Sequence, residues 1–464
     1  MTKGYFALCE YVSEKSVSLI GAGVSNLPLV SFLYECDAKS VCVRDLKKKM
    51  DDPEIITVLN NGGKVVLGES YLDDLNEDII IRSPGIRPDL QEFLSAVKNG
   101  SELPCETDLF LKYVHCKNVA ITGIDGKTTT TTLTSKILER SGYQVFLGGN
   151  IGKSMLPQLK EIDPEKSVSV MELSSFQLMN CRYSPDISII TNLSENHLDW
   201  HRGMEEYLEA KKNILKHQSE NSRAVLNLDN RHTSQCSVNG SCCYFTYDPQ
   251  KANTVTESVY CDGKTIFHRK DGKTRAILPL EDILLPGKHN VENYMAAIAA
   301  VIGLTNVEAI LHVAKTFGGV EHRIELCRVL DGVKYYNSSI DSSPSRSTAC
   351  LRAFDQKVIM IAGGYDKNLD YTSLGDEICK HVKVLILCGA TSKKIKDAVV
   401  SSKEYAESNL KVIDSPDFDS TAKIAKDNAV TGDIVVLSPA SASFDLFKNF
   451  EVRGQTFKRL VMEL

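Results

Sequence analysis

AITGIDGKTTTTT, from Ala120 to Thr132, is the stretch on which the fold and the chemistry of this chain depend. A standard phosphate-binding loop reads G-x-x-x-x-G-K-[ST], but here Ile121 stands where the first glycine belongs. Gly123 begins a shorter pattern, G-x-x-G-K-T. The stretch is therefore either a shortened nucleotide site or a threonine-rich turn that happens to contain a lysine.

The residues around this loop have the properties that a nucleotide site needs. Val119–Thr122 is apolar and β-branched, as expected of a buried strand. Gly123 and Gly126 permit backbone conformations that turn N–H groups toward a ligand, and the helix predicted next would direct its positive end to the loop. Lys127 can reach phosphate oxygens, and the Thr128 hydroxyl can join a magnesium shell. A strand-to-helix turn with a solvated lysine remains the alternative.

Length and composition narrow the possible classes of protein. The 464 residues suit about three domains with separate cores. A net charge of −6 disfavours nucleic-acid and anionic-membrane partners. Glu10 and Glu14 interrupt the N-terminal segment, so it lacks a signal-peptide core, and no apolar run approaches the ~20 residues of a membrane span. We expect a cytoplasmic protein, and a monomer.

The fourteen cysteines are scattered and form no C-x-x-C pair. Their only cluster is Cys236, Cys242, Cys243 and Cys261, whose spacing matches neither a zinc ribbon nor a zinc finger, so zinc is the weaker alternative. We expect reduced thiols, most of them packed as small apolar residues.

Strand and helix patterns alternate along the chain, which predicts parallel sheets with crossover helices and hence an α/β fold. We predict three domains, at residues 1–112, 113–319 and 320–464. Between about Cys236 and Pro279 the pattern becomes short, polar and hairpin-like, which predicts a small antiparallel addition. The predicted strands are SVSLIGAG, SVCVRD, KVVLG and EDIIIRSPG in the first domain, SVSVMEL, DISIITNLS and RAVLNLDN in the second, and KVIMIAGG, KVLILCG and DIVVLSP in the third.

The first predicted strand ends in GAGVSN, Gly21 to Asn26, which is part of a dinucleotide-binding pattern. The first two glycines permit a tight turn against a phosphate, and Asp45 lies near the end of the next strand. Asn26 replaces the third glycine of G-x-G-x-x-G, so an NAD-dependent dehydrogenase is the weaker interpretation.

Three further polar residues lie where predicted strands or helices would bring them toward the phosphate loop. Glu172 follows a buried strand, His197 lies in a loop after another strand, and Lys211 lies on a helix. Each has an ordinary explanation on its own: a helix cap, a solvated histidine and a surface lysine. Together with the lysine and threonine of the loop, they supply what a magnesium–ATP site needs.

In this order the motifs resemble the Mur ligase family, the ATP-dependent amide ligases that build the peptidoglycan stem peptide. The family's phosphate loop has the short form T-G-x-x-G-K-T, which matches Thr122 to Thr128. The resemblance runs nearly end to end through GAGVSN, SPGI, TGIDGKTT, GGNIG, ELSSFQL, NHLD, EAKKNI, GKHNVEN, EHRIE, GGYDKN and SPASASFDLFKNFEVRG.

The resemblance implies a Rossmann-like N-terminal domain, a central P-loop-type ATPase domain and a Rossmann-like C-terminal domain. It also implies three substrates: ATP, UDP-N-acetylmuramoyl-L-alanine (UDP-MurNAc-L-Ala) and D-glutamate. ATP would convert the UDP-linked substrate to an acyl phosphate, to which D-glutamate would then be joined. The implied ATP-binding residues are Gly123, Asp125, Gly126, Lys127, Thr128, Thr129, Asn290, Asn293 and Arg323. Those implied for the UDP-linked substrate are Val24, Ser25, Asp45, Ser83 and Asn150. Those implied for D-glutamate are Ser342, Lys367, Ser443 and Phe450.

The resemblance further implies two Mg²⁺ ions held by Thr128, Glu172, His197 and Lys211. Lys211 matches a lysine that is carbamylated in this family, which would turn a cation into an anionic metal ligand. Lys127, His197 and Lys211 are therefore the expected catalytic residues.

One stretch departs from the family pattern. In VKYYNSSIDSSPSRS, Ser338 stands where the family usually has an aspartate that contacts ATP, and Asp341 stands where a small residue is usual. We expect the lost contact to weaken ATP binding, unless Asp341 has taken it over. Two alternatives stay open: a catalytically weak or silent nucleotide-binding member of the family, and another amide ligase of the same superfamily.

Overall fold

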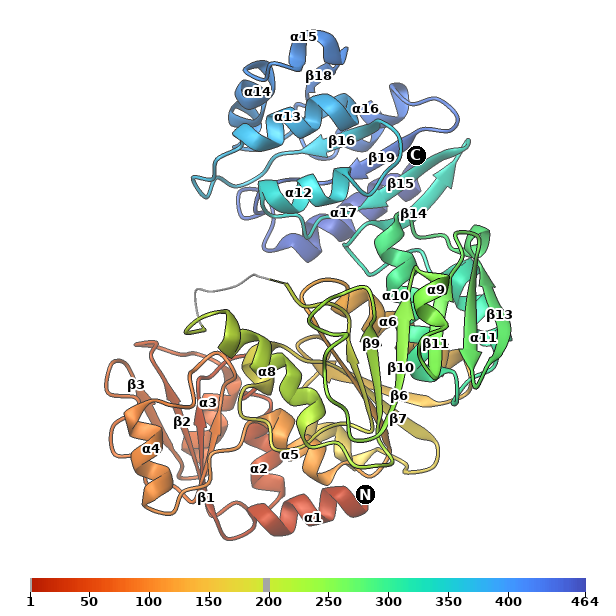
Figure 1. Cartoon of the computed structure of the whole chain (residues 1–464). Helices are drawn as coiled ribbons and strands as arrows, with labels where there is room; N and C mark the ends of the chain where they lie inside the picture. Colours follow the sequence, from red (N-terminus) through yellow and green to blue (C-terminus); the bar gives the residue numbers. More distant parts are fainter. Residues whose placement is uncertain (1, 195–200) are drawn as a thin grey trace. The chain divides into compact units, whose positions relative to one another are not determined.

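The computed structural model describes residues 2–194 and 201–464 and divides the chain into two compact units (Figure 1). The first unit comprises Met1–Asp282 and Val291–Lys315, and the second comprises Ile283–Asn290 and Thr316–Leu464. Among the described residues, no helix combines the length and the apolar character that a membrane crossing requires.

The N-terminal part of the first unit is a four-stranded parallel sheet in the order β3-β2-β1-β4. The β-branched residues of β1, β2 and β4 are almost fully buried, as expected of a sheet covered by crossover helices, whereas those of the edge strand β3 are partly buried. The strands are β1 (Ser16–Ile20), β2 (Ser40–Asp45), β3 (Lys64–Leu67) and β4 (Ile79–Arg82). The helices are α1 (Lys3–Val12), α2 (Leu29–Glu35), α3 (Pro53–Asn60), α4 (Gln91–Lys98) and α5 (Glu106–Tyr113).

The rest of the first unit is built on a nine-stranded sheet in the order β13-β12-β11-β10-β9-β8-β5-β7-β6. The strands are β5 (Lys117–Thr122), β6 (Gln144–Gly149), β7 (Ser167–Glu172), β8 (Ile187–Ile190), β9 (Arg223–Asn227), β10 (Ser241–Thr246), β11 (Glu257–Cys261), β12 (Thr265–Lys270) and β13 (Lys273–Pro279). The helices are α6 (Lys127–Arg140), η1 (Leu156–Lys160), α7 (Ser175–Leu178), α8 (Met204–Lys216), α9 (Pro249–Ala252), η2 (Leu280–Asp282), α10 (Lys288–Val301) and α11 (Val307–Thr316).

The predicted antiparallel addition is only partly correct. β12 pairs antiparallel with β11 and with β13, but β10 pairs parallel with both β9 and β11. The reason is the short helix α9, which carries the chain back across the sheet between β10 and β11 and so makes the two strands parallel. The segment therefore extends the central sheet.

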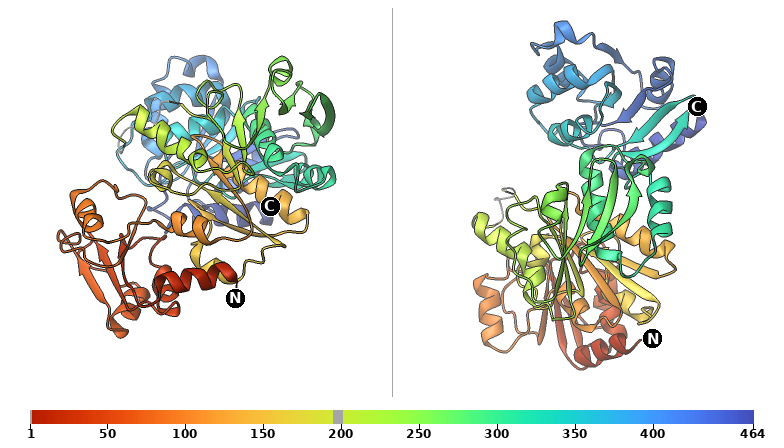
Figure 2. Two further views of the ribbon diagram at one scale, coloured as in Figure 1. Left: turned by 60° about the horizontal axis from the view of Figure 1, so that its bottom comes forward. Right: turned by 45° about the vertical axis from the view of Figure 1, so that its right-hand side comes forward.

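The second unit contains a six-stranded sheet in the order β14-β15-β19-β16-β17-β18, in which only β14 runs antiparallel to its neighbour. Helices lie on both faces of this sheet (Figure 2). Separate hydrophobic clusters include residues of α12 and α13 in one case and of α16 and α17 in the other. The strands are β14 (Glu325–Leu330), β15 (Val333–Asn337), β16 (Val358–Ala362), β17 (Val382–Leu387), β18 (Lys411–Asp414) and β19 (Ile434–Leu437). The helices are α12 (Pro344–Leu351), α13 (Thr372–His381), α14 (Ser392–Val400), α15 (Tyr405–Ser408), α16 (Thr421–Asp427) and α17 (Phe450–Glu463).

The three parallel-rich sheets confirm the predicted α/β fold class. One hydrophobic cluster continues from the first sheet into the central sheet, through residues of α1 and α5. This shared cluster explains why the first two predicted domains form one compact unit.

The expectation that all cysteines are reduced thiols is wrong for one pair. Cys9 of α1 and Cys36, which follows α2, are joined by a disulfide, with their Cα atoms 4.4 Å apart. The packing of α1 against α2 brings them together across 27 residues of sequence. Every other cysteine is free, and the four clustered cysteines are not among the potential metal-binding groups of the described residues.

Candidate active site

The phosphate loop joins β5 to α6 and has the backbone geometry that the sequence predicts. Gly123 and Gly126 have φ angles of 144° and 77°, a region that side chains disfavour. A side chain at Gly126 would also collide with Asn293 Oδ1 of α10, so the loop and this predicted ATP-binding residue are in close contact. Because α6 begins at Lys127, the N–H groups of its first turn face the loop.

Two residues that follow β8 hold the loop in place. Asn192 Oδ1 accepts hydrogen bonds from the N–H groups of Ile124 and Asp125, at 3.3 and 3.0 Å. The Thr191 hydroxyl donates to the Asp125 carbonyl at 2.7 Å. Sequence reasoning missed these roles of Thr191 and Asn192, although both lie in the TNLS segment directly before the NHLD motif.

Two lysines of the site donate hydrogen bonds to carbonyls of the loop backbone. Lys127 Nζ donates to the Ile124 carbonyl at 2.8 Å, which keeps its ammonium over the loop. Lys211, on α8, is 3% exposed and donates to the Gly123 carbonyl at 2.7 Å. Thr128 and Thr129 occupy the first turn of α6 beside Lys127. The structure therefore brings both predicted catalytic lysines to one loop.

Burial changes the charge state of Lys211. Its pKa is lowered to about 7, first by removal of the amine from water and then by the nearby charge of Lys127, while Glu172 acts in the opposite direction. A lysine with such a pKa is neutral in about half of the molecules near pH 7. A neutral amine is a nucleophile, and an ammonium is not.

Glu172 ends β7 and is 1% exposed. Its Oε1 accepts a hydrogen bond from Asn150 Nδ2 at 2.7 Å, whereas its buried Oε2 has no hydrogen-bond partner among the described residues. A buried carboxylate oxygen without a donor is costly, and it suits a bound cation. Glu172 therefore fits a magnesium ligand; His197 lies outside the described residues.

An ion-pair network anchors the helix that carries Lys211. Arg87, after β4, pairs with Glu206 on α8 at 2.8 Å and with Asp89 at 2.9 Å. His201 is buried beside them, and its Nε2 lies 2.9 Å from the Ser175 hydroxyl on α7. None of these residues was predicted as functional, because single charges in loops carry no local signal.

Four of the residues predicted to hold the UDP-linked substrate lie at the carboxyl end of the first sheet: Val24, Ser25, Asp45 and Ser83. Asp45 accepts hydrogen bonds from the N–H groups of Ala22 and Lys47, at 2.7 and 2.8 Å, so it fixes the glycine turn. Val24 is 92% exposed beside this turn. Gly21 lies so close to Ser83 that a Cβ at Gly21 would be 2.7 Å from the Ser83 Cβ.

Asn26 has a structural role that explains the missing third glycine of GAGVSN. Its buried Nδ2 donates to the carbonyls of Ile20 and Ile81, at 3.0 and 3.4 Å. These carbonyls lie at the ends of β1 and β4, so the Asn26 amide joins the two strands. In a dinucleotide-binding fold this position is a glycine that allows close packing of the helix against the strand.

The residues predicted to hold D-glutamate all lie in the second unit, as do the predicted ATP-binding residues Asn290 and Arg323. Ser342 follows β15, Lys367 follows β16, Ser443 follows β19, and Phe450 begins α17. Since these parallel strands end at one edge of the sheet, the four positions share that edge.

Arg453 is a buried residue that sequence reasoning missed at this edge. Its guanidinium donates to the carbonyls of Ser339, Ser441 and Ala442, at 2.9, 3.1 and 3.0 Å. Burial lowers its pKa to about 10. Arg453 thus fixes the loop that ends in Ser443. In the sequence, only its place in FEVRG, at the end of the last motif, indicated a role for it.

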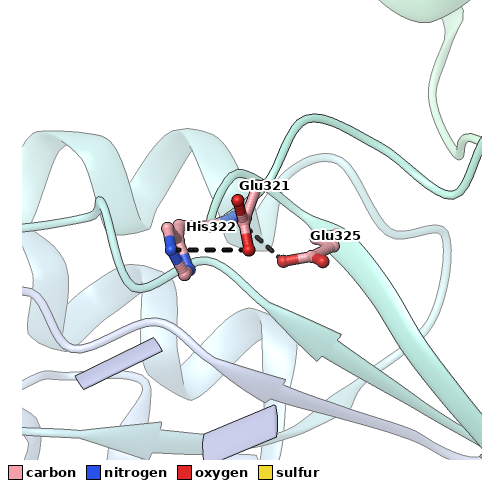
Figure 3. A group of neighbouring side chains, drawn as sticks. All are labelled: Glu321, His322 and Glu325. Atoms are coloured by element: carbon pink, nitrogen blue, oxygen red, sulfur yellow. Dashed lines mark hydrogen bonds and ion pairs between the residues drawn. The ribbon is translucent and has the colours of Figure 1, made fainter. Parts of the chain in front are cut away.

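Glu321, His322 and Glu325 are the one group among the described residues whose atoms could surround a metal ion (Figure 3). Protein donors already occupy these atoms: Lys458 Nζ lies 3.1 Å from Glu321 and 2.6 Å from Glu325. His322 Nδ1 lies 2.9 Å from the Asn337 amide. The group is therefore better explained as a network that joins β14, β15 and α17.

Ser338 and Asp341 are both buried. This burial changes the expectation that one of these positions contacts ATP. Ser338 is 0% exposed, and its hydroxyl accepts a hydrogen bond from the Ile324 N–H at 3.2 Å. Asp341 is 6% exposed and accepts from the Ser438 hydroxyl at 2.8 Å. Burial raises the pKa of Asp341 to about 6, while hydrogen bonds from Ser338 and Ser438 act against this rise.

Ser338→Asp is therefore expected to destabilise the protein. The new carboxylate would be buried beside Asp341, and an uncompensated buried charge costs about 3–5 kcal/mol. Differential scanning calorimetry should show this loss, whereas Ser345→Asp, an exposed position in the first turn of α12, should change stability by about 0.5 kcal/mol or less. A stable Ser338→Asp variant with tighter ATP binding would instead support the original expectation of a missing ATP contact.

Asp341→Asn is expected to remove a pH dependence of stability. The folded-state pKa of Asp341, about 6, lies above its ordinary value of 3.8, so the stability contributed by its protonation is fully present below pH 3.8 and is lost as pH rises through 6. The loss corresponds to roughly 3 kcal/mol. Hydrogen exchange of β15 and β19 amides should show weaker protection at pH 7 than at pH 4.5 in the parent, with a smaller difference in the variant. Equal differences in the two proteins would contradict the assignment.

Comparisons with known proteins agree with this geometry. Residues 121–301 match the family model for the Mur ligase middle domain. The chain is 44% identical over 459 residues to a UDP-N-acetylmuramoylalanine–D-glutamate ligase of Ruminiclostridium cellulolyticum, covering 98% of this chain and 97% of that protein. It is also 44% identical over 462 residues to the protein of that name in Acetivibrio thermocellus, with 97% of each covered.

A solved structure shows the same fold at low sequence identity. The UDP-N-acetylmuramate-alanine ligase MurC from Thermotoga maritima aligns over 97% of this chain and 98% of its own, with a TM-score of 0.55 and 16% identity. The relatives are ligases, so the dehydrogenase interpretation of GAGVSN is not supported. The chain belongs to the Mur ligase family, among the UDP-N-acetylmuramoylalanine–D-glutamate ligases.

Proposed function

We propose that this chain is an ATP-dependent ligase that joins D-glutamate to UDP-MurNAc-L-Ala, in the synthesis of peptidoglycan precursors. The names of its full-length relatives support the substrates. The observation that carries the proposal is the arrangement of Lys127, Lys211 and Glu172 around a phosphate loop. Two lysines at a helix N-terminus, with a carboxylate that has one oxygen without a donor, suit a site for ATP and a divalent cation.

The reaction has two steps. The alanyl carboxylate attacks the γ-phosphorus of ATP, so that an acyl phosphate forms while the bond to the ADP oxygen breaks. The amine of D-glutamate then attacks the acyl carbon, the amide bond forms, inorganic phosphate leaves and the amine loses a proton. The first step brings two anions together, so the positive charge of Lys127 and the N–H groups of the loop are its main requirement.

The proposed metal ligands fit the residues present. Glu172 Oε2 is the buried oxygen without a donor, and the Thr128 hydroxyl lies at the start of α6. Mg²⁺ held there would offset the negative charge of the phosphate oxygens. We propose two such ions, with His197 as a further ligand.

The proposal includes carbamylation of Lys211. The lowered pKa supplies a neutral amine at physiological pH, and a neutral amine adds to CO₂ with formation of an N–C bond and release of a proton. The product would be an anionic oxygen ligand on a buried stem, in place of a buried cation. This chemistry fits a lysine whose ammonium form is disfavoured by burial.

The remaining assignments are part of the same proposal. The uridine nucleotide would bind along Val24, Ser25 and Asp45, and the muramoyl-alanine part would face Ser83, Asn150 and His197. Asp125, Asn290, Asn293 and Arg323 would complete the ATP site, and Ser342, Lys367, Ser443 and Phe450 would bind D-glutamate. The division into domains 1–112, 113–319 and 320–464, the monomeric state and the cytoplasmic location are proposed with it.

The proposal is tested by release of inorganic phosphate from ATP in the presence of UDP-MurNAc-L-Ala and a panel of amino acids. We expect release that requires both the UDP-linked substrate and D-glutamate. Release with a different amino acid would favour another amide ligase of the superfamily. Binding of ATP without any release would favour a catalytically silent member, the candidate that Ser338 in place of the usual aspartate suggests.

A further inference from the structure

A cavity of about 530 Å³ opens at the amino-terminal ends of the central parallel strands. The cavity is lined by Lys117, Ile187 and Arg223, which lie at the starts of β5, β8 and β9, and by residues of β11–β13 and of the segment that leads into α11. The phosphate loop follows the opposite end of β5. At about 3.3 Å per residue, that strand separates the cavity from the loop by roughly 20 Å. The cavity is therefore distinct from the candidate active site.

The lining of this cavity is positively charged, although the chain as a whole carries −6. Its cationic side chains are Lys117, Arg223, Lys270 and Arg275, and its carboxylates are Asp186 and Glu257. With His268 neutral, four cations face two carboxylates, which leaves two positive charges in excess. A local excess of this sign favours an anionic ligand.

Protein donors already engage both carboxylates. Glu257 is 5% exposed and accepts from Arg223 at 2.8 and 3.1 Å and from His268 at 2.9 Å. Although burial acts to raise it, hydrogen bonds from His268 and Arg223 hold the pKa of Glu257 well below its ordinary range. Asp186 Oδ2 accepts from the backbone and the side chain of Asn118, both at 3.0 Å. Neither carboxylate is therefore a strong partner for the outer cations.

Those outer cations lie together on the ribbon formed by β12 and β13. Arg275 pairs across the ribbon with His268, and Lys270 lies two residues from His268, so all three share one face. Lys270 approaches Glu257 only to 3.4 Å. The Arg275 side chain has no hydrogen bond or ion pair with any residue in the described part of the chain. An exposed arginine with free donors is the side chain best suited to bind a phosphate group through two hydrogen bonds.

Part of the cavity lining is apolar. Ile187, Ala300 and Leu304 contribute to it. Val307, the first residue of α11, also lines it. An apolar wall with a few convergent polar groups, and a volume between about 300 and 1,000 Å³, is typical of small-molecule sites.

We propose that this cavity binds a small phosphorylated ligand. Its phosphate would bind Lys270 and Arg275, with Lys117 nearby, and its uncharged body would pack against Ile187, Ala300 and Leu304. The site is additional to the proposed ligase site and does not depend on that function. It gives the enzyme a second place, at the far edge of the same sheet, where a phosphorylated metabolite can bind.

Lysine footprinting of the full-length protein tests the proposal, with inorganic pyrophosphate as the probe. An acylating reagent followed by mass spectrometry reports the reactivity of each lysine. We expect about 1 mM pyrophosphate to slow acylation of Lys117 and Lys270 at least threefold, as a site with a Kd of about 0.5 mM or less requires. Lys264, an exposed lysine of the same hairpin outside the cavity, should react at an unchanged rate.

Arg275→Ser should abolish this protection, because it removes the free phosphate-binding fork. Lys264→Ser is the matched control, since it removes one positive charge from the same hairpin and should leave protection intact. Both positions are exposed, so both variants should keep the parent's thermal stability. Protection of Lys127 alone, equal protection of Lys264, or protection that survives in Arg275→Ser would each overturn the proposal.

Discussion

Lys127→Ala is expected to lower ligase turnover by at least about 100-fold, the usual cost of removing a group that stabilises charge in a transition state. Lys127 Nζ lies over the phosphate loop, bonded to the Ile124 carbonyl, at the point where the transferring phosphate would gain negative charge. Steady-state phosphate release at saturating ATP, UDP-MurNAc-L-Ala and D-glutamate measures the effect. The fall should be in kcat, since the contact strengthens as charge develops.

Lys136→Ala is the matched control for this variant. Lys136 lies on the same helix, is exposed, and pairs with Glu139 at 3.0 Å. Its removal deletes the same charge away from the loop, so activity should stay within about twofold, as surface ion pairs contribute little. Comparable activity in the Lys127 and Lys136 variants would contradict the assignment of the phosphate loop.

The Lys127→Ala variant should also change the titration of Lys211. The charge of Lys127 is one cause of the lowered pKa of Lys211, so Lys127→Ala should raise that pKa. The pH at which half of the Lys211 amine reacts with an acylating reagent should therefore move upward. This readout does not require turnover, and it separates an electrostatic role from a merely structural one.

Local sequence patterns were sufficient to predict the elements that carry the site. Runs of β-branched residues marked β5, β7 and β8, because a strand buried on both faces has little room for polar side chains. The spacing of Gly123 and Gly126 marked the loop, because only glycine tolerates both backbone conformations there. These signals are contained within a few residues, so they need no knowledge of the fold.

The features that were missed depend on contacts between distant residues. The helix α1 was not predicted, and its neighbours α5 and η1 lie about a hundred or more residues away along the chain. The pairing of Cys9 with Cys36 depends on how two helices pack. Asn192 supports the phosphate loop from 67 residues away, and Arg453 reaches Ser339 across 114 residues.

At Ser338, the buried environment changes the interpretation that the family resemblance suggested. From sequence alone, the serine suggested a lost contact to ATP. In the structure it lies in a buried polar cluster with Asp341 and Ser438, in which Asp341, three residues further on, supplies the carboxylate. Burial, rather than residue type, decides whether a carboxylate can be added at this position.

Lys211→Ala is expected to reduce ligase activity nearly to background and to regain part of it with added short-chain carboxylates. Lys211 is 3% exposed and donates to Gly123 of the phosphate loop, so its removal empties the position where the carbamate oxygens would hold a metal ion. A small carboxylate can enter that space and replace the lost anionic ligand. Phosphate release by the variant, measured against carboxylate concentration, should rise and saturate.

Lys212→Ala provides the control, because Lys212 is the next residue on α8 and pairs with Glu209 at 2.9 Å outside the site. It should keep near-parental activity and respond to no carboxylate. Lys211→Arg should also be inactive and unrescued, since its guanidinium fills the space but cannot form a carbamate at neutral pH.

Since carbamate formation needs the neutral amine, parent activity at limiting bicarbonate should rise with pH through about 7, the pKa of Lys211. Full activity of Lys211→Ala without carboxylate would show that this lysine is an ordinary buried side chain and that the second metal site lacks it.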